Sequence, residues 1–389
     1  MKVGHIADIH LKGGWDTEEA RALLKAADLF IAQKTDLVCV NGDVYEDVSS
    51  PEDRLVFRNF VNILRDRGIT VIVLRGNHDK PSDLKIFESQ VESVEIIEFE
   101  KPGSIRLWFD SSLQKDLLVY AIPHFSAGAL ALKSGSVEEM NSTGTELFTD
   151  LLENAFQKLR QHNGPRLVLF HGTVSGAKLD NDRIPRQNGI HLPLAVLESL
   201  DCPVVGGHYH KPQNVGGKVW YSGSITRQTW GEAEDDKGVL IWEMDSEGNW
   251  FPEPVFHSLN PVPMITVNAE WNGESLVDKS TNLEIDPSSF ASDSKLRLRF
   301  DVSENLVHTV PKDLVSRFRN SAELKIEKTI LTTTAVRSEA MVSAITIEDS
   351  LRVWLEAKGK TMEEIETHLS EYRKIKLKSE SGNSEENAA

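Results

Sequence analysis

The sequence contains very little cysteine. Only two cysteines occur in 389 residues, Cys39 and Cys202, and each lies in or beside an apolar run. So few thiols cannot form a disulfide framework of the kind that stabilises small secreted domains. We therefore interpret both residues as small buried apolar side chains in a reducing cytosol.

The sequence also lacks a long apolar run. No stretch is long enough to span a bilayer, so we expect no membrane association. The first six residues lead directly into a strand-like segment, which leaves no room for a signal peptide with its charged start and cleavage site. These absences together predict a cytoplasmic protein.

Positive charge is scarce as well. The chain has 43 Lys and Arg against 60 Asp and Glu, which gives a net charge of -17. This balance argues against a protein that coats nucleic acid by basic charge alone. It does not exclude a nuclease, because acidic residues can bind metal ions and the ions bring positive charge to a phosphate.

Short apolar runs alternate with amphipathic segments over the first 260 or so residues. Strand–helix–strand alternation of this kind predicts an α/β domain, which we assign to residues 1–260. Asp16 is a candidate cap for a helix over 17–34, and Ser50 for one that begins at Pro51. A third helix is expected over about 145–161. The predicted buried strands are residues 3–6, 37–40, 71–74, 117–122, 167–170 and 203–205.

The pattern changes after residue 260. Strand-like segments at 264–267, 296–300 and 324–330, with a short helix at 312–319, predict a small α+β domain over 261–340. Thr346 and Thr361 then have the pattern of N-caps for two helices in residues 341–378. Residues 379–389 are rich in Ser, Glu, Asn and Gly and are expected to be disordered.

Polar residues that can bind metal ions follow one predicted strand after another. In open α/β sheets, ligands bind beyond the carboxyl ends of the strands, so a site is expected there. Asp8 and His10 are two residues apart, as are His208 and His210, so in extended chain each pair points to one side. The residues in question are Asp8, His10, Asp43, Asn77, His78, Asp79, His171, His208 and His210.

This mixture of carboxylates, imidazoles and one amide suits two divalent metal ions. Mn²⁺ fits such a set best, with Mg²⁺, Fe²⁺ and Zn²⁺ as alternatives. A carboxylate shared by two ions about 3.5–4 Å apart is the known arrangement for attack at phosphorus. Asp43 is the candidate for this bridge.

Five motifs resemble, in order and spacing, those of the calcineurin-like metallophosphoesterases. They are Asp8-x-His10, Gly42-Asp43, Gly76-Asn77-His78-Asp79, His171-Gly172 and Gly207-His208-x-His210. A single Asp-x-His is a weak signal, but five motifs in order are specific. The resemblance implies a four-layer α/β sandwich, with two mixed sheets flanked by helices, a small α+β capping domain and C-terminal helices.

Further segments resemble the SbcD branch of that family. They are His208-Tyr209-His210-Lys211-Pro212-Gln213, Tyr221-Ser222-Gly223-Ser224-Ile225-Thr226-Arg227, Gly231-Glu232 and Asp236-Lys237-Gly238. This branch holds nuclease subunits of double-strand-break repair complexes from bacteria, archaea, eukaryotes and phages. The resemblance implies a Mn²⁺-dependent exonuclease and endonuclease acting on DNA, a coiled-coil ABC-type ATPase partner bound through residues 341–378, and a homodimer formed by helices at 51–67 and about 82–91. A phage protein would act in the host cytoplasm.

The resemblance also implies a role for each site residue. Asp8, His10, Asp43 and His210 would hold one metal ion, and Asp43, Asn77, His171 and His208 the other. His78 would contact the scissile phosphate and either stabilise the transition state or protonate the leaving oxygen, and Asp79 would orient His78. Glu46 departs from archaeal and eukaryotic relatives, which have a histidine at this position, and agrees with bacterial ones.

Other features have a structural and a functional interpretation. We favour structural roles for His5 and His124, while the segment 222–224 is either a simple turn or part of a substrate groove. The apolar faces of the two C-terminal helices would pack on the capping domain or, as we favour, dock on the partner. The enzyme could also be a phosphodiesterase or phosphatase of the same superfamily that acts on a small molecule or phosphoprotein, or a scaffold that has lost its metal ions.

Overall fold

The computed structural model describes residues 1–84, 97–99, 102–109, 116–124, 137–178, 190–318, 322–332 and 346–382. The chain divides into two compact units. One contains Met1–Ile265 with Ser292–Lys295, and the other contains Thr266–Ala291 with Leu296–Ala389. The finer division into residues 1–260, 261–340, 341–378 and 379–389 stays a prediction.

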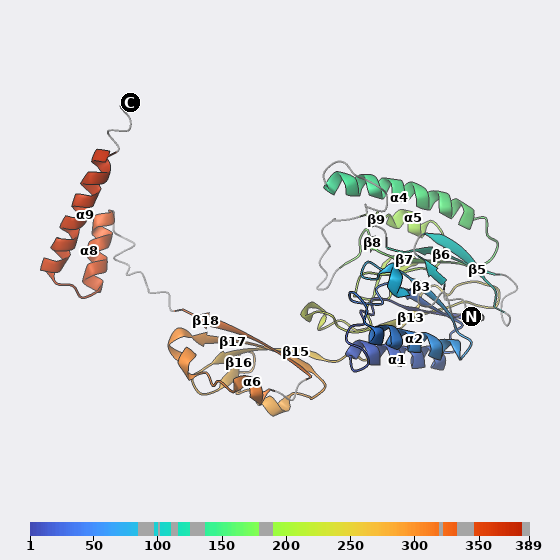
Figure 1. Cartoon of the computed structure of the whole chain (residues 1–389), viewed down its shortest axis with the longest axis horizontal. Helices are drawn as coiled ribbons and strands as arrows, with labels where there is room; N and C mark the ends of the chain where they lie inside the picture. The colour runs from blue at the N-terminus through green and yellow to red at the C-terminus, as the bar shows by residue number, and fades with distance from the viewer. Residues whose placement is uncertain are drawn as a thin grey trace. The chain divides into compact units, whose positions relative to one another are not determined.

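The first unit contains two six-stranded mixed sheets (Figure 1). In the first sheet the four N-terminal strands run parallel, and two later strands extend the sheet at one edge, each antiparallel to its neighbour. In order across the sheet, these strands are β14 (Val255–Ser258), β13 (Gly238–Glu243), β1 (Lys2–Ile6), β2 (Leu37–Asn41), β3 (Thr70–Leu74) and β4 (Ile97–Phe99).

The second sheet has four parallel strands between two antiparallel edge strands. Across the sheet these are β11 (Gln213–Gly216), β12 (Val219–Tyr221), β10 (Val204–Gly207), β7 (Arg166–His171), β6 (Leu117–Ile122) and β5 (Gly103–Leu107). A separate short parallel pair is formed by β8 (Thr173–Val174) and β9 (His191–Leu192). All six predicted strands are therefore present, and the α/β class is confirmed.

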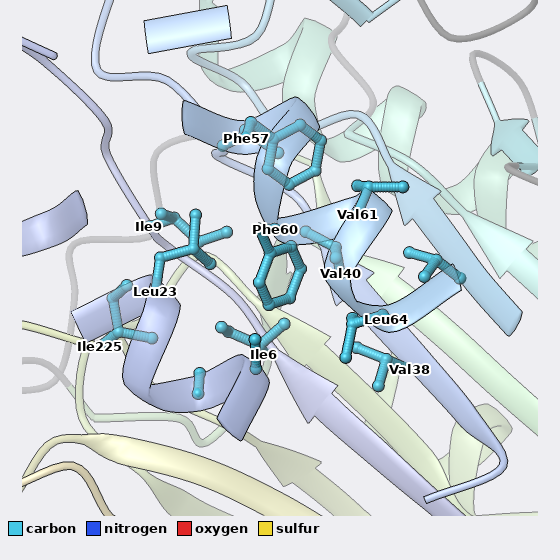
Figure 2. Packing of buried hydrophobic residues seen from close by; sticks show 14 of the residues in the cluster. Ile6, Ile9, Leu23, Val38, Val40, Phe57, Phe60, Val61, Leu64 and Ile225 are labelled. Carbon is cyan, nitrogen blue, oxygen red and sulfur yellow. The ribbon is translucent and has the colours of Figure 1, made fainter. Parts of the chain in front are cut away.

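Helices cover the outer faces of both sheets (Figure 1). Strand β2 shows why: Val38 and Val40 belong to the core beneath α1 and α2, whereas Leu37 and Cys39 belong to the core between the two sheets. Figure 2 shows the first of these cores, where Phe57 and Phe60 of α2 pack over the sheet. The covering helices are α1 (Glu18–Ala32), α2 (Pro51–Arg65) and α3 (Pro81–Leu84) with the first sheet, and α4 (Val137–Leu159) and α5 (Leu194–Glu198) with the second.

The order of layers is thus helix, sheet, sheet, helix, as the family resemblance implied. The outer core of the second sheet joins Phe148 and Phe156 of α4 to Val168 and Phe170 of β7. Each of these phenylalanines is almost fully buried. Burial of such a side chain contributes about 1.5–3 kcal/mol relative to leaving it in water, so strands that are apolar on both faces favour packing layers on both sides.

Of the two helix caps predicted in the first unit, one is confirmed and the other is wrong. Ser50 caps α2 with a full capping box. Its hydroxyl accepts a hydrogen bond from the Asp53 amide, and the Asp53 carboxylate accepts one from the Ser50 amide. Helix α1 is capped by Thr17, not by Asp16 as predicted. Thr17 has the extended backbone of a cap, and its hydroxyl accepts a hydrogen bond from the Ala20 amide at 3.2 Å.

His5 lies in the middle of β1, between β2 and β13, and is fully buried. Neither ring nitrogen has a hydrogen-bond partner among the residues that the structure describes. Burial lowers the pKa of His5 to about 3. A buried imidazole without hydrogen-bond partners lowers the free energy of unfolding, so His5 destabilises an otherwise apolar strand.

We expect His5→Leu to raise the free energy of unfolding by about 1–3 kcal/mol at pH 7.5, because it removes unpaired polar atoms. The pH dependence should change too. Below about pH 6.5 the unfolded chain protonates His5 while the folded chain does not until about pH 3, so wild-type stability falls as pH falls. Urea unfolding in EDTA should show that the free energy of unfolding falls less between pH 7.5 and pH 5 in the variant than in wild type. An equal loss in both proteins would contradict this account.

The second unit contains a four-stranded sheet and a helical hairpin. Along β17 the side chains alternate between buried and accessible, and Leu296, Leu298 and Phe300 are buried. In order across the sheet, the strands are β16 (Leu276–Asp278), β15 (Met264–Trp271), β17 (Lys295–Ser303) and β18 (Glu323–Leu331). Its short helices are η5 (Pro287–Ser289), η6 (Glu304–Thr309) and α6 (Leu314–Arg317).

The hairpin consists of α8 (Ile347–Ala357) and α9 (Met362–Gly382). Thr346 caps α8 with a capping box, and Gly359 with φ 71° lies in the turn between the helices. Residues 379–382 of the predicted tail are helical, because α9 extends to Gly382, and 383–389 lie outside the described residues. Within the described ranges, no helix has both the length and the apolar character needed to cross a membrane.

Candidate metal centre

The seven predicted metal ligands lie where strands of both sheets end. Asp8 and His10 follow β1, Asp43 follows β2 and Asn77 follows β3, while His171 ends β7 and the pair His208 and His210 follows β10. Hydrogen bonds join the two sheets here: the His171 ring donates from Nδ1 to the Asn41 carbonyl at 2.7 Å, and the His208 amide donates to Asp8 at 2.9 Å. The fold therefore brings all seven residues to one region.

Asp8, His10 and His210 form a first cluster. Their donor atoms lie within 4.8 Å of one another, and His10 Nε2 is 3.2 Å from His210 Nε2. Two nitrogens about 2.1 Å from one shared metal ion would be roughly 3.0–3.4 Å apart at angles of about 90–109°. The spacing of these two rings therefore suits a common ion.

A second cluster surrounds the side-chain oxygen of Asn77. This oxygen is 3.0 Å from His171 Nε2 and 2.9 Å from His208 Nδ1, and Asp43 Oδ2 is 3.4 Å from His171 Nε2. Asp43, His171 and His208 also offer donor atoms within 4.8 Å of one another. The donor spacing again suits one ion. The sharing of Asp43 with the first cluster stays a prediction.

The backbone is strained at the same residues. Asp8, His10 and Asp43 have φ of 50°, 53° and 52°, and His208 has φ 106°. Non-glycine residues rarely adopt positive φ, and such conformations persist where the surrounding fold enforces them. Sharp reversal of the chain after each strand turns these side chains toward one another.

Two glycines allow this close approach. A Cβ on Gly76 would lie 2.0 Å from Asp43 Oδ1, and one on Gly42, which has φ 93°, would lie 2.2 Å from His171 Nδ1. Any larger residue would displace Asp43 or His171. Steric constraints therefore explain why glycine occupies these two positions of the predicted motifs.

The buried carboxylates of this site need a compensating positive charge. Burial raises the pKa of Asp8, although nearby histidines oppose this. Burial alone would lower the pKa of His171, but the adjacent Asp43 carboxylate raises it to about 9. Without a metal ion, a proton on His171 thus balances the buried carboxylate. A metal ion binds only the neutral ring and must displace this proton.

Two of the four histidine rings are hydrogen-bonded at Nδ1 to a group outside the predicted ligand set. His171 uses the Asn41 carbonyl, and His210 Nδ1 is hydrogen-bonded to Glu232 Oε1 at 3.2 Å. His10 Nδ1 lies 2.7 Å from Glu46 Oε2, but the two groups are not aligned for a hydrogen bond. Sequence reasoning missed these contacts, and the only signals that could have suggested them are the Gly231-Glu232 motif and the departure at Glu46.

His78 lies beside the first cluster, with its ring centre 5.0 Å from that of His10. Its Nδ1 is hydrogen-bonded to the Glu46 carbonyl at 2.7 Å, so the ring is oriented by backbone and not by Asp79 as predicted. Asp79 instead accepts hydrogen bonds from the amides of Val44, Tyr45 and Gly76 at 2.8–3.1 Å. Its buried carboxylate therefore fixes the two loops that carry Asp43 and Asn77.

His124, for which we predicted a structural role, lies at the edge of the second cluster. Its ring centre is 6.2 Å from that of His171 and 6.3 Å from that of His208. The turn at 222–224 is buried, and the Ser224 amide donates to the His210 carbonyl at 3.1 Å. This turn therefore supports the loop that carries His210, as the structural interpretation expects.

Comparisons with known proteins identify the family. Residues 1–212 match the family model for calcineurin-like phosphoesterases. A dimetal phosphatase from Danio rerio is similar at 11% identity, with 67% of this chain and 99% of that chain covered and a TM-score of 0.41. The protein TT1561 of Thermus thermophilus has the same identity and coverage with a TM-score of 0.36. Because both TM-scores are low, the assignment depends on the family match, which spans more than half of the chain: this protein belongs to the calcineurin-like phosphoesterases.

Proposed function

We propose that this metal-dependent phosphoester hydrolase is a Mn²⁺-dependent DNA nuclease, with exonuclease activity on double strands and endonuclease activity on single strands, in DNA repair and recombination. The observation that carries the proposal is the pair of donor clusters, Asp8–His10–His210 and Asp43–His171–His208, with Asn77 and His78 beside them. Two such clusters suit the in-line displacement of an oxygen at phosphorus.

The chain's own residues have separate tasks in this scheme. When bound, two divalent ions would activate water and neutralise charge on the phosphate. The Glu46 carbonyl holds His78 by Nδ1, which leaves Nε2 for the substrate. As an imidazolium, this ring can donate a hydrogen bond to the phosphate or a proton to the leaving oxygen. Asp79 keeps the Asp43 and Asn77 loops in place.

DNA as the substrate is supported mainly by sequence. The segments around His208–Gln213, Tyr221–Arg227 and Asp236–Gly238 resemble the SbcD branch. The site is also accessible, since Asn77 is exposed and His78 is half-buried, as a polymeric substrate requires. A chain with net charge -17 would repel DNA, so the metal ions would supply the local positive charge.

The test is a cleavage assay with Mn²⁺, end-labelled linear duplex DNA and circular single-stranded DNA. The chain is assayed alone and with the coiled-coil ABC-type ATPase of the same source. We expect metal-dependent shortening of the duplex and cutting of the circle. Hydrolysis of p-nitrophenyl phosphate, a phosphopeptide or a small phosphodiester, without any DNA cleavage, would instead support the alternative of a phosphatase or small-molecule phosphodiesterase.

We also propose the ATPase as a partner of the hairpin α8–α9. Among the side chains described in this hairpin, Leu355, Ile365 and Leu369 form a small buried core, and the partly buried Leu351 packs against it. Ile347, Trp354, Met362 and Ile375 are exposed, which leaves apolar surface for a coiled coil. Loss of ATPase binding in Trp354→Glu would support this interaction, and unchanged binding would contradict it.

A homodimer through α2 is a related proposal. Leu55 of α2 and nearby Val48 are exposed, and much of the other helix expected in the interface, about 82–91, lies outside the described residues. Light scattering that gives a single-chain mass at micromolar concentration would contradict a dimer. We place the activity in the cytoplasm, that of the host if the protein is phage-encoded.

A further inference from the structure

A buried ion pair lies directly behind His210. Glu232 ends the short helix η4 (Trp230–Glu232), and Lys237 precedes β13. Their side chains are 1% and 0% exposed, and Lys237 Nζ is 2.7 Å from Glu232 Oε2. Asp235 Oδ2 lies 3.9 Å from the same nitrogen. Burial of two charged groups is costly unless their hydrogen bonds are satisfied.

Hydrogen bonds link each of Glu232 and Lys237 to His210 as well as to each other. Glu232 Oε1 is hydrogen-bonded to His210 Nδ1 at 3.2 Å, and Lys237 Nζ donates to the His210 carbonyl at 2.7 Å. The pair therefore holds both the imidazole and the backbone of one residue. Glu232 accepts two more hydrogen bonds, from the Gln228 amide at 3.1 Å and the Thr229 hydroxyl at 3.2 Å. Its carboxylate has little freedom to move.

The direction of the His210 ring follows from this arrangement. With Nδ1 directed at Glu232, Nε2 faces the first cluster and lies 3.2 Å from His10 Nε2. A carboxylate on the far nitrogen of a metal-binding histidine fixes its tautomer and makes it a stronger ligand. The corresponding partner of His171 is a neutral carbonyl, so the two clusters differ in the charge behind their histidines.

We infer that Glu232, fixed by Lys237, is a positioning residue that strengthens metal binding at the Asp8–His10–His210 cluster. This assigns a task to two of the SbcD-like motifs, Gly231-Glu232 and Asp236-Lys237-Gly238. Glu46 is less suited to this task, because its side chain is 38% exposed and is not aligned for a hydrogen bond with His10. The inference rests on the proposed two-metal site and is independent of DNA as the substrate.

The test is a Mn²⁺ titration of metal-free protein, with free Mn²⁺ measured by electron paramagnetic resonance. Wild type should bind two ions. In Glu232→Gln, one of the two ions should bind about 10–100-fold more weakly and the other as in wild type. Glu234→Gln is the matched control, because Glu234 is exposed and lies in the same segment. It should bind both ions as wild type does.

A role in folding alone would give a different result. Glu232→Gln would then lower the melting temperature but leave both affinities unchanged, and this outcome would overturn the inference. Because Glu232→Gln leaves Lys237 with less compensating charge, the double variant Glu232→Gln/Lys237→Met should be titrated as well. It contains neither charge of the pair and should show the same loss at one ion. Wild type that binds no Mn²⁺ would instead refute the two-metal site itself.

Discussion

The variant Asp43→Asn should remain folded, bind at most one metal ion tightly and lose phosphodiester hydrolysis by at least about 1,000-fold. Loss of a partner outside the ligand set typically costs about 10–100-fold, so loss of a ligand that is predicted to serve both ions should cost more. Asp43 is 2% exposed, and its Oδ2 is 3.4 Å from His171 Nε2. Asparagine tolerates the φ of 52° at this position, whereas alanine would add backbone strain.

Metal content by mass spectrometry and hydrolysis of a phosphodiester should be measured on the same preparation. Asp28→Asn is the control, because Asp28 is exposed on α1 and the substitution is chemically the same. It should match wild type in both measurements. If Asp43→Asn bound two ions with wild-type affinity, Asp43 would not be a ligand, and the assignment of both clusters would need revision.

The variant His78→Ala should have the opposite profile, with both metal ions retained and kcat lowered by about 100- to 10,000-fold. His78 contacts Glu46 through Nδ1 and stands beside His10, but it is not needed to complete either group of predicted ligands. Its loss should therefore affect the reaction and leave coordination intact.

Two substrates with different leaving groups distinguish the two roles that His78 can have. If Nε2 protonates the leaving oxygen, cleavage of DNA, whose leaving alkoxide is a strong base, should suffer far more than cleavage of bis-p-nitrophenyl phosphate, whose phenolate leaves unaided. If the ring only binds the phosphate, both substrates should lose similar activity. A variant with wild-type rates on both substrates would remove His78 from the mechanism.

The fold, and the convergence of the predicted ligands on one region, were predictable from sequence because their signals are local. Short apolar runs mark strands such as β2 and β7, and the polar residues that follow them fall at a common edge once the strands run parallel. The cap at Ser50 is equally local, since Ser50, Pro51 and Asp53 lie within one turn. Helix α4 was predicted to start near residue 145 but begins at Val137, in a segment with weak helix formers such as Gly144.

The features that sequence could not show depend on contacts between distant segments. Glu232 meets a ring 22 residues earlier in the chain, and no periodic pattern links the two. The family resemblance implied that Asp79 orients His78, yet the Asp79 carboxylate accepts hydrogen bonds from the Gly76 and Val44 amides instead. Likewise, the positive φ of Asp8 and Asp43 is set by the packing of whole loops.

We propose that two metal ions occupy one site at the carboxyl ends of the strands of both sheets. The decisive measurement is a crystal structure of the protein grown with Mn²⁺, with anomalous scattering measured at the manganese edge. We expect two peaks, one among Asp8, His10 and His210 and one among Asn77, His171 and His208, with Asp43 in contact with both. A single peak, no peak, or peaks outside these residues would contradict the account.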